Sequence, residues 1–93
     1  MKNKDLIDLP KYLKAIGDGN RLSILKSLKK RPLCVCEIFL LLNLPQNLTS
    51  HHLKILKNTG LVNTKRNGVK IIYSRDEKVI DKYQALLTNI IEL

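Results

Sequence analysis

The 93-residue sequence lacks the features of several protein classes. It has no tryptophan and only three tyrosines and one phenylalanine, so no stacking platform for RNA bases is evident. Its longest apolar run, Ile38 to Leu42, is far shorter than the roughly 18 residues of a membrane span. The first residues also lack the long apolar stretch of a signal peptide. We therefore expect a soluble, cytoplasmic protein with no membrane partner.

Catalytic motifs are missing as well. The sequence has no Gly-rich phosphate loop, no paired carboxylates and no nucleophile accompanied by a base and an orienting group. We therefore predict that the protein is not an enzyme. Its two cysteines, Cys34 and Cys36, are too few for a disulfide framework. Their spacing relative to His51 and His52 fits no zinc finger, so they are either core residues or a thiolate site.

Acidic residues are absent from the middle of the chain. The 17 Lys and Arg outnumber the 8 Asp and Glu and give a net charge of +9, yet no acid occurs from Ile38 through Arg75. A basic segment between segments of mixed charge is typical of a nucleic-acid-binding face. The alternative is a chain that is simply rich in lysine throughout.

Apolar periodicity predicts a mainly α-helical fold with a small β-hairpin, in a single domain over residues 1–93. The expected order is four helices, two strands and a last helix. The predicted helices cover residues 6–16, about 20–28, 34–42, 46–58 and 76–93, and the strands cover 61–66 and 69–74.

Several local signals set these boundaries. Asn20 is the expected N-cap of the second helix, and Gly60 is expected to close the fourth. Asn67-Gly68 is a strong hairpin-turn signal between the strands. The third helix, 34–42, is apolar nearly all round, and we therefore expect it to be the most buried.

The helix at 46–58 is predicted to have one apolar and one polar half when its residues are placed at about 100° intervals. His52 falls among the leucines and isoleucine of the apolar half, where a core role is the simplest interpretation. The polar half contains amides, a hydroxyl, an imidazole and lysines, which are groups that contact base edges and phosphates in a DNA major groove. The predicted DNA-binding residues of this helix are Gln46, Asn47, Ser50, His51, Lys54 and Lys57. The alternative is an ordinary solvated face.

Three further basic residues, Lys65, Arg66 and Lys70, lie near the predicted hairpin tip. A basic hairpin beside such a helix can contact the DNA backbone or the adjacent minor groove. Lysines also protect exposed edge strands from aggregation, and both interpretations can hold together.

The sequence resembles the ArsR/SmtB family of metal-responsive repressors along most of its length. The similar segments are YLKAIGDGNRL at 12–22, LCVCE at 33–37, LPQNLTSHHLK at 44–54, GLV at 60–62 and IYS at 72–74. The resemblance implies a winged helix-turn-helix homodimer that leaves its double-stranded operator DNA when metal binds. It implies base contacts from Gln46, Ser50 and His51, and dimerisation through the helices at 6–16 and 76–93.

The resemblance also implies that Cys34 and Cys36 bind arsenite or antimonite, or cadmium or lead, as inducers; DNA binding itself needs no cofactor. Two positions in a helix are separated by about 200°, so binding one ion at both sulfurs should require loosening the first turn of the 34–42 helix. The family's third cysteine is replaced by Phe39. Two alternatives stay open: buried core cysteines with no metal input, and a thiol redox switch.

Overall fold

The computed structural model describes residues 3–92, and for residues 3–7 it describes the backbone alone. Within these residues the chain forms α1 (Asn3–Ile16), α2 (Gly19–Lys30), β1 (Leu33–Cys34), α3 (Val35–Leu42), α4 (Gln46–Asn58), β2 (Val62–Asn67), β3 (Lys70–Arg75) and α5 (Glu77–Ile91). The predicted helical fold with a β-hairpin is confirmed. The Leu6 side chain and Leu93, both in predicted dimerisation helices, lie outside the described residues.

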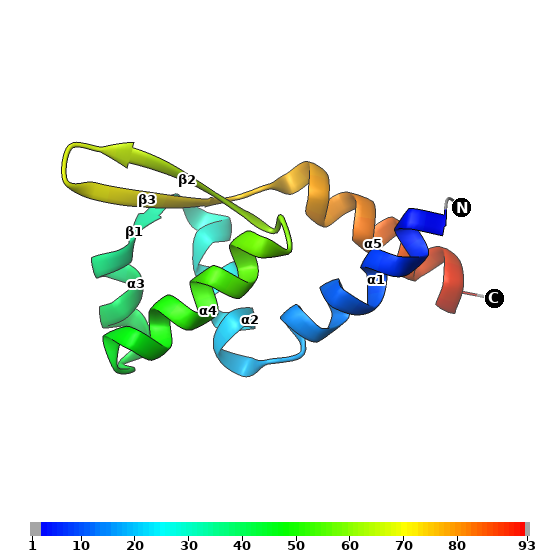
Figure 1. Cartoon of the computed structure of the whole chain (residues 1–93), viewed down its shortest axis with the longest axis horizontal. Coiled ribbons are helices and arrows are strands. Elements are labelled where there is room, and N and C mark those ends of the chain that lie inside the picture. Colours follow the sequence, from blue (N-terminus) through cyan, green and yellow to red (C-terminus); the bar gives the residue numbers. More distant parts are fainter. Residues whose placement is uncertain (1–2, 93) are drawn as a thin grey trace.

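The molecule is elongated, with extents of 44 × 24 × 21 Å along its principal axes. Figure 1 shows α1 and α5 together at one end, and the β2–β3 hairpin extending over α3 and α4 at the other. None of the helices in residues 3–92 has the length and apolar character needed to cross a membrane.

The second helix begins earlier than its predicted cap. Asp18 has an extended backbone, and its carboxylate accepts hydrogen bonds from the amides of Asn20 (2.9 Å) and Arg21 (3.1 Å). The predicted cap at Asn20 is therefore wrong, because Asn20 is already inside the helix. The hydrogen bond from the Arg21 amide is the main cause of a lowered pKa at Asp18.

The third helix differs most from its prediction. Cys34 lies in a two-residue strand that pairs with β3, with Cys34 opposite Ile72 in a sheet of order β1-β3-β2. The helix therefore begins at Val35. Ile38 is buried, but Leu40 and Leu41 are 76% and 61% exposed, so the expectation that this helix is the most buried is wrong. The helix packs on α2, α4 and the strands β1 and β3, and these contacts leave Leu40 and Leu41 uncovered.

The fourth helix ends in a Schellman motif, as the position of Gly60 predicts. The Leu61 amide donates to the carbonyl of Leu56 and the Gly60 amide to that of Lys57, both at 3.0 Å. Gly60 has φ of +79°, a conformation that suits glycine because it has no Cβ. The predicted bounds of this helix, 46–58, are confirmed.

The hairpin turn lies one residue later than predicted. Asn67 pairs with Lys70, so the two-residue loop is Gly68-Val69 rather than Asn67-Gly68. Gly68 has φ of +64°, and glycine in the first central position is typical of a type II′ hairpin turn. This register leaves Val69 almost fully exposed at the tip.

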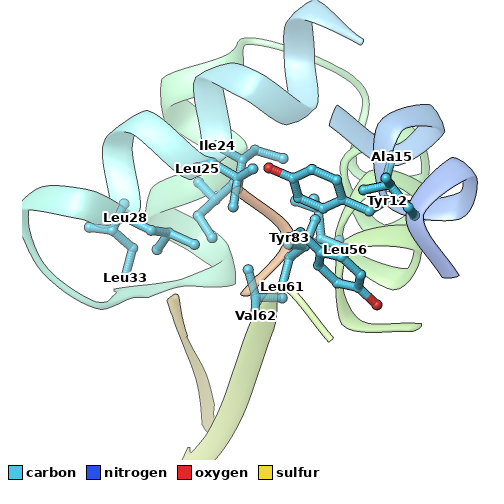
Figure 2. Packing of buried hydrophobic residues seen from close by; sticks show 13 residues of the cluster. Tyr12, Ala15, Ile24, Leu25, Leu28, Leu33, Leu56, Leu61, Val62 and Tyr83 are labelled. Atoms are coloured by element: carbon cyan, nitrogen blue, oxygen red, sulfur yellow. The ribbon is translucent and has the colours of Figure 1, made fainter. Parts of the chain in front are cut away.

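The core joins α1, α2, α4, α5 and the start of β2. Leu56 and Leu61 have no exposed surface, and Figure 2 shows them beside Val62 and Tyr83. The Tyr12 ring of α1 stacks on Tyr83 of α5, with centroids 4.6 Å apart. Because α4 gives its apolar side to this core, its opposite side faces outward.

Candidate nucleic-acid interface

The outer face of α4 is polar, exposed and free of carboxylates. Leu53 and Leu56, on the other face, are 1% and 0% exposed. The exposed polar residues of the outer face are Gln46, Asn47, Ser50, His51, Lys54, Lys57 and Asn58. The structure thus brings together on one helix face all six DNA-binding residues that the sequence predicts for this helix.

Two residues of α4 refine the predicted division into an apolar and a polar half. Leu48, placed in the apolar half, is 39% exposed. Thr49 is buried, and its hydroxyl donates to the carbonyl of Pro45 at 3.3 Å. At about 100° per residue Thr49 falls between Leu56 and Leu53, so its burial agrees with the predicted apolar half. A threonine one turn after a helix start can bond back to the chain in this way, which is the signal that could have identified it.

The two adjacent histidines point to different environments, as predicted. His51 is exposed, whereas His52 is 6% exposed and its Nδ1 lies 3.0 Å from Nη1 of Arg21. Burial lowers the pKa of His52 below its usual range, so the ring is neutral at pH 7. Among the side chains that the structure describes, those of residues 8–92, no group of three or more metal-ligating residues is present.

The hairpin provides the second part of the basic surface. Lys65, Arg66 and Lys70 are exposed near its tip. Arg75, in the same acid-free segment, instead turns inward, donating to the carbonyl of Leu25 at 3.2 Å and to the Glu77 carboxylate at 2.9 Å. The basic surface therefore consists of α4 and the hairpin tip, and excludes the base of β3.

Replacing Lys65, Arg66 and Lys70 with alanine should weaken binding to all duplexes alike. Each lost phosphate contact should reduce the slope of log K against log salt by roughly 0.9, because fewer counterions are released. Fluorescence anisotropy from about 50 to 200 mM salt measures this slope. The matched control removes three lysines of α2, Lys26, Lys29 and Lys30, and an equal change there would assign the effect to net charge alone.

The cysteine pair lies beside this surface, at the start of α3. The sulfurs of Cys34 and Cys36 are bonded as a disulfide, with the Cα atoms 5.4 Å apart. Cys34 is an N-cap residue with an extended backbone, so the angular separation expected inside a helix does not apply. The expectation that α3 must loosen to bring both sulfurs together is wrong.

The surroundings of the two sulfurs differ. Cys34 is 3% exposed, and its amide donates to Oε1 of Glu37 at 3.0 Å. Arg31 donates to the other carboxylate oxygen at 2.7 Å, and this hydrogen bond is the main cause of a lowered pKa at Glu37. Cys36, by contrast, is an exposed residue.

A small cavity connects Cys36 with α4. It has a volume of about 160 Å³, and its lining residues are Val35, Cys36, Phe39, Gln46, Thr49 and Ser50. Two predicted DNA-contact residues, Gln46 and Ser50, therefore share a cavity with the exposed cysteine. The sequence alone gave no indication of this proximity, because it depends on how α3 packs on α4.

The helix pair α3–α4 followed by a basic hairpin is the arrangement of a winged helix-turn-helix. The sequence model of the bacterial regulatory proteins of the arsR family matches residues 18–64, from the cap of α2 into β2. The chain belongs to the arsR family. It is a DNA-binding transcriptional regulator, and the hairpin is its wing.

Individual relatives agree with this assignment. An uncharacterised HTH-type transcriptional regulator of Methanocaldococcus jannaschii is 44% identical over 68 residues, covering 71% of this ArsR-family chain and 76% of the relative. The arsenical resistance operon repressor of Staphylococcus xylosus is 35% identical over 74 residues, covering 80% of this chain and 71% of the relative.

A solved structure extends the likeness to nearly the whole chain. It is the homodimeric winged helix-turn-helix DNA-binding domain of a possible ArsR-family regulator from Mycobacterium bovis, with TM-score 0.77, 25% identity and coverage of 99% of this chain and 89% of that one. The family and these relatives are transcriptional regulators rather than enzymes, in agreement with the sequence analysis.

Proposed function

We propose that this regulator is a homodimeric repressor that binds a palindromic double-stranded operator with α4 in the major groove. The observation that carries the proposal is the exposed, amide-rich and acid-free face of α4 beside a basic wing. Any carboxylate on that face would be repelled by DNA phosphates, whereas amides can pair bidentately with adenine.

The order of side chains along α4 fits this orientation. Recognition helices contact base edges mainly with their N-terminal residues. Gln46, Asn47 and Ser50 occupy the first turns of α4, while Lys54 and Lys57 follow nearer its end. The amides and hydroxyl therefore serve base recognition, with His51 beside them, and the lysines contact the backbone.

The proposed dimer forms through the α1–α5 end, at residues 6–16 and 76–93. Exposed apolar side chains gather on these helices: Leu13 is 38% exposed on α1, and Ile90 and Ile91 are 48% and 66% exposed at the end of α5. A symmetric interface would remove this apolar surface from water. The similar structure from Mycobacterium bovis is homodimeric.

Cys34 and Cys36 are the proposed site at which an inducer acts. Reduction of the disulfide leaves two thiols on neighbouring strand and helix positions, and thiolates are preferred ligands of soft, thiophilic ions. Arsenite or antimonite, or cadmium or lead, would bind both sulfurs, with further ligands from outside the pair. Binding there would alter the cavity that Cys36 shares with Gln46 and Ser50, and thereby the DNA-contact face.

Replacing both cysteines with serine tests this role. The double variant should bind operator DNA as tightly as the reduced wild-type protein, because neither sulfur is part of the α4 face. It should fail to dissociate when arsenite, antimonite, cadmium or lead is added. Anisotropy titrations on the same duplex, in the presence of a phosphine reductant, provide the comparison. Unchanged release of the double variant would remove the cysteines from the sensing mechanism.

A second candidate input, oxidation, is favoured by the disulfide itself. Formation of the bond removes two electrons and two protons from the dithiol, and two equivalents of a small thiol reverse it while forming their own disulfide. If this is the signal, oxidised and reduced wild-type protein will differ in operator affinity without metal, and the serine variant will not respond. Equal affinities in all states, with and without metals, would indicate a regulator with neither input.

A further inference from the structure

Arg21 connects three helices at a position away from the proposed DNA-contact face. Its Nε donates to the carbonyl of Ala15 at 2.6 Å, and its Nη2 to that of Lys14 at 3.3 Å. Both carbonyls belong to the last turn of α1. Its Nη1 lies 3.0 Å from Nδ1 of His52, on the inner face of α4. One side chain of α2 therefore joins the end of α1 to the recognition helix.

The chemistry of this contact fixes the state of the histidine. An arginine side chain can only donate hydrogen bonds, so Nδ1 of His52 is the acceptor and the ring proton lies on Nε2. Burial lowers the pKa of His52, with smaller contributions from Arg21 and His51, while the Asp18 carboxylate at 3.9 Å acts in the opposite direction. Asp18 also caps α2 and accepts from the Arg21 amide, which holds the arginine in place.

Side-chain packing between α1 and α4 is incomplete beside this contact. A cavity of about 460 Å³ lies there, with Arg21 in its wall. Its other lining residues are Lys11, Lys14 and Ala15 of α1, Ile55 and Asn58 of α4, and Thr59, the C-cap of α4. Because open volume separates the two helices here, the hydrogen bonds of Arg21 restrain their separation where packing does not.

We propose that Arg21 and His52 are positioning residues, whose hydrogen bond fixes the orientation of α4 relative to the α1–α5 end of the molecule. Because the proposed dimer forms through that end, the hydrogen bond also sets the spacing of the two recognition helices in the dimer. The inference rests on the proposed dimeric function, since spacing matters only when two copies bind one operator. Half-sites lie about 10 base pairs apart or at multiples of that distance. If the recognition helices can change their orientation, their spacing no longer fits the spacing of the half-sites.

Two substitutions of His52 separate positioning from general stability. His52→Leu is apolar and suits its buried surroundings, but it removes the acceptor and leaves Nη1 of Arg21 unpaired. His52→Asn is also neutral, and its amide oxygen can take the place of Nδ1 as acceptor. A purely structural role predicts that the asparagine variant is the worse of the two, whereas a positioning role predicts that it is the better.

A distance measurement without DNA tests whether the hydrogen bond between Arg21 and His52 fixes the position of α4. Spin labels at Lys11→Cys on α1 and Lys54→Cys on α4 are introduced in the Cys34→Ser, Cys36→Ser background, and the protein is diluted with unlabelled chains to remove signals between subunits. We expect a narrow distance distribution in this parent and in His52→Asn, and a broadened or shifted one in His52→Leu. An unchanged distribution in His52→Leu would overturn the proposal.

Operator spacing provides the functional readout. A palindromic duplex is selected from random DNA with the unlabelled Cys34→Ser, Cys36→Ser protein as the parent, which retains Lys54, and a second copy of the duplex receives one extra base pair between the half-sites. We expect His52→Leu to bind the selected duplex about tenfold more weakly, as for a lost hydrogen bond to a charged group, and to lose most of the preference over the spaced duplex. His52→Asn should keep the affinity and the preference.

The outcomes distinguish the two proposals. Full spacing preference in His52→Leu, or an equal loss in both variants, would overturn the positioning role. If the parent selects no palindromic duplex, the proposed dimeric function fails, and the spin-label distances still decide whether Arg21 and His52 fix α4.

Discussion

Replacing Gln46, Ser50 and His51 together with alanine should abolish sequence-specific operator binding. These side chains are exposed on the outer face of α4, so their removal leaves the core intact. A good contact to a base edge contributes about 1–3 kcal/mol of discrimination, and losing three should weaken specific binding about 100-fold or more. Affinity for a random duplex should change little, because the lysines that contact phosphates remain.

The matched control lies on the same helix. Lys54→Ala combined with Lys57→Ala should weaken binding to operator and random DNA alike, with the ratio of the two affinities preserved. Competition titrations of both variants against operator and random duplexes, at one salt concentration, give these ratios. A triple alanine variant that retains the wild-type ratio would show that α4 does not recognise the bases, and the repressor proposal would lose its central observation.

The recognition helix could be predicted to the residue because its signals are local. Pro45 precedes it, the apolar period continues through it, and Gly60 closes it with a positive φ. Its exposed face follows from the same period, since the core takes one side of any amphipathic helix. For the same reason the sequence separates the exposed His51 from the buried His52.

The third helix could not be predicted as well, because its environment is tertiary. A strand of two residues has no alternation to detect, so β1 becomes visible only when Cys34 pairs with Ile72 across the sheet. That pairing makes Cys34 extended and places its sulfur against Cys36. The exposure of Leu40 and Leu41 likewise depends on which elements cover α3, and an all-apolar helix is compatible with either outcome.

The polar contacts on the inner face of the recognition helix could not be predicted from the sequence either. Arg21 and His52 are 31 positions apart, and no local pattern indicates that one donates to the other. The cavity beside Cys36 has the same origin, since residues from two helices line it. The chemical character of each side chain could be inferred from the sequence, whereas which side chains lie close together could be learned only from the fold.

Leu56→Ala should cause one of the largest losses of stability of the alanine substitutions on α4. Leu56 has no exposed surface and lies beside Leu61 in the core (Figure 2). Truncating a fully buried leucine removes apolar contacts and leaves a cavity, which costs about 2–5 kcal/mol. Since small domains have unfolding free energies of about 5–15 kcal/mol, a large part of the total stability should be lost.

Urea unfolding followed by circular dichroism measures this effect at a fixed protein concentration, because dimer formation would make apparent stability depend on concentration. The matched control is Leu48→Ala, two turns earlier in α4, where the side chain is 39% exposed. This substitution should cost no more than about 1 kcal/mol, since the residue is already partly in water and its truncation leaves no closed cavity. Similar losses for the two leucines would mean that α4 does not present one face to the core, and its outer face could then not be the free surface that DNA recognition requires.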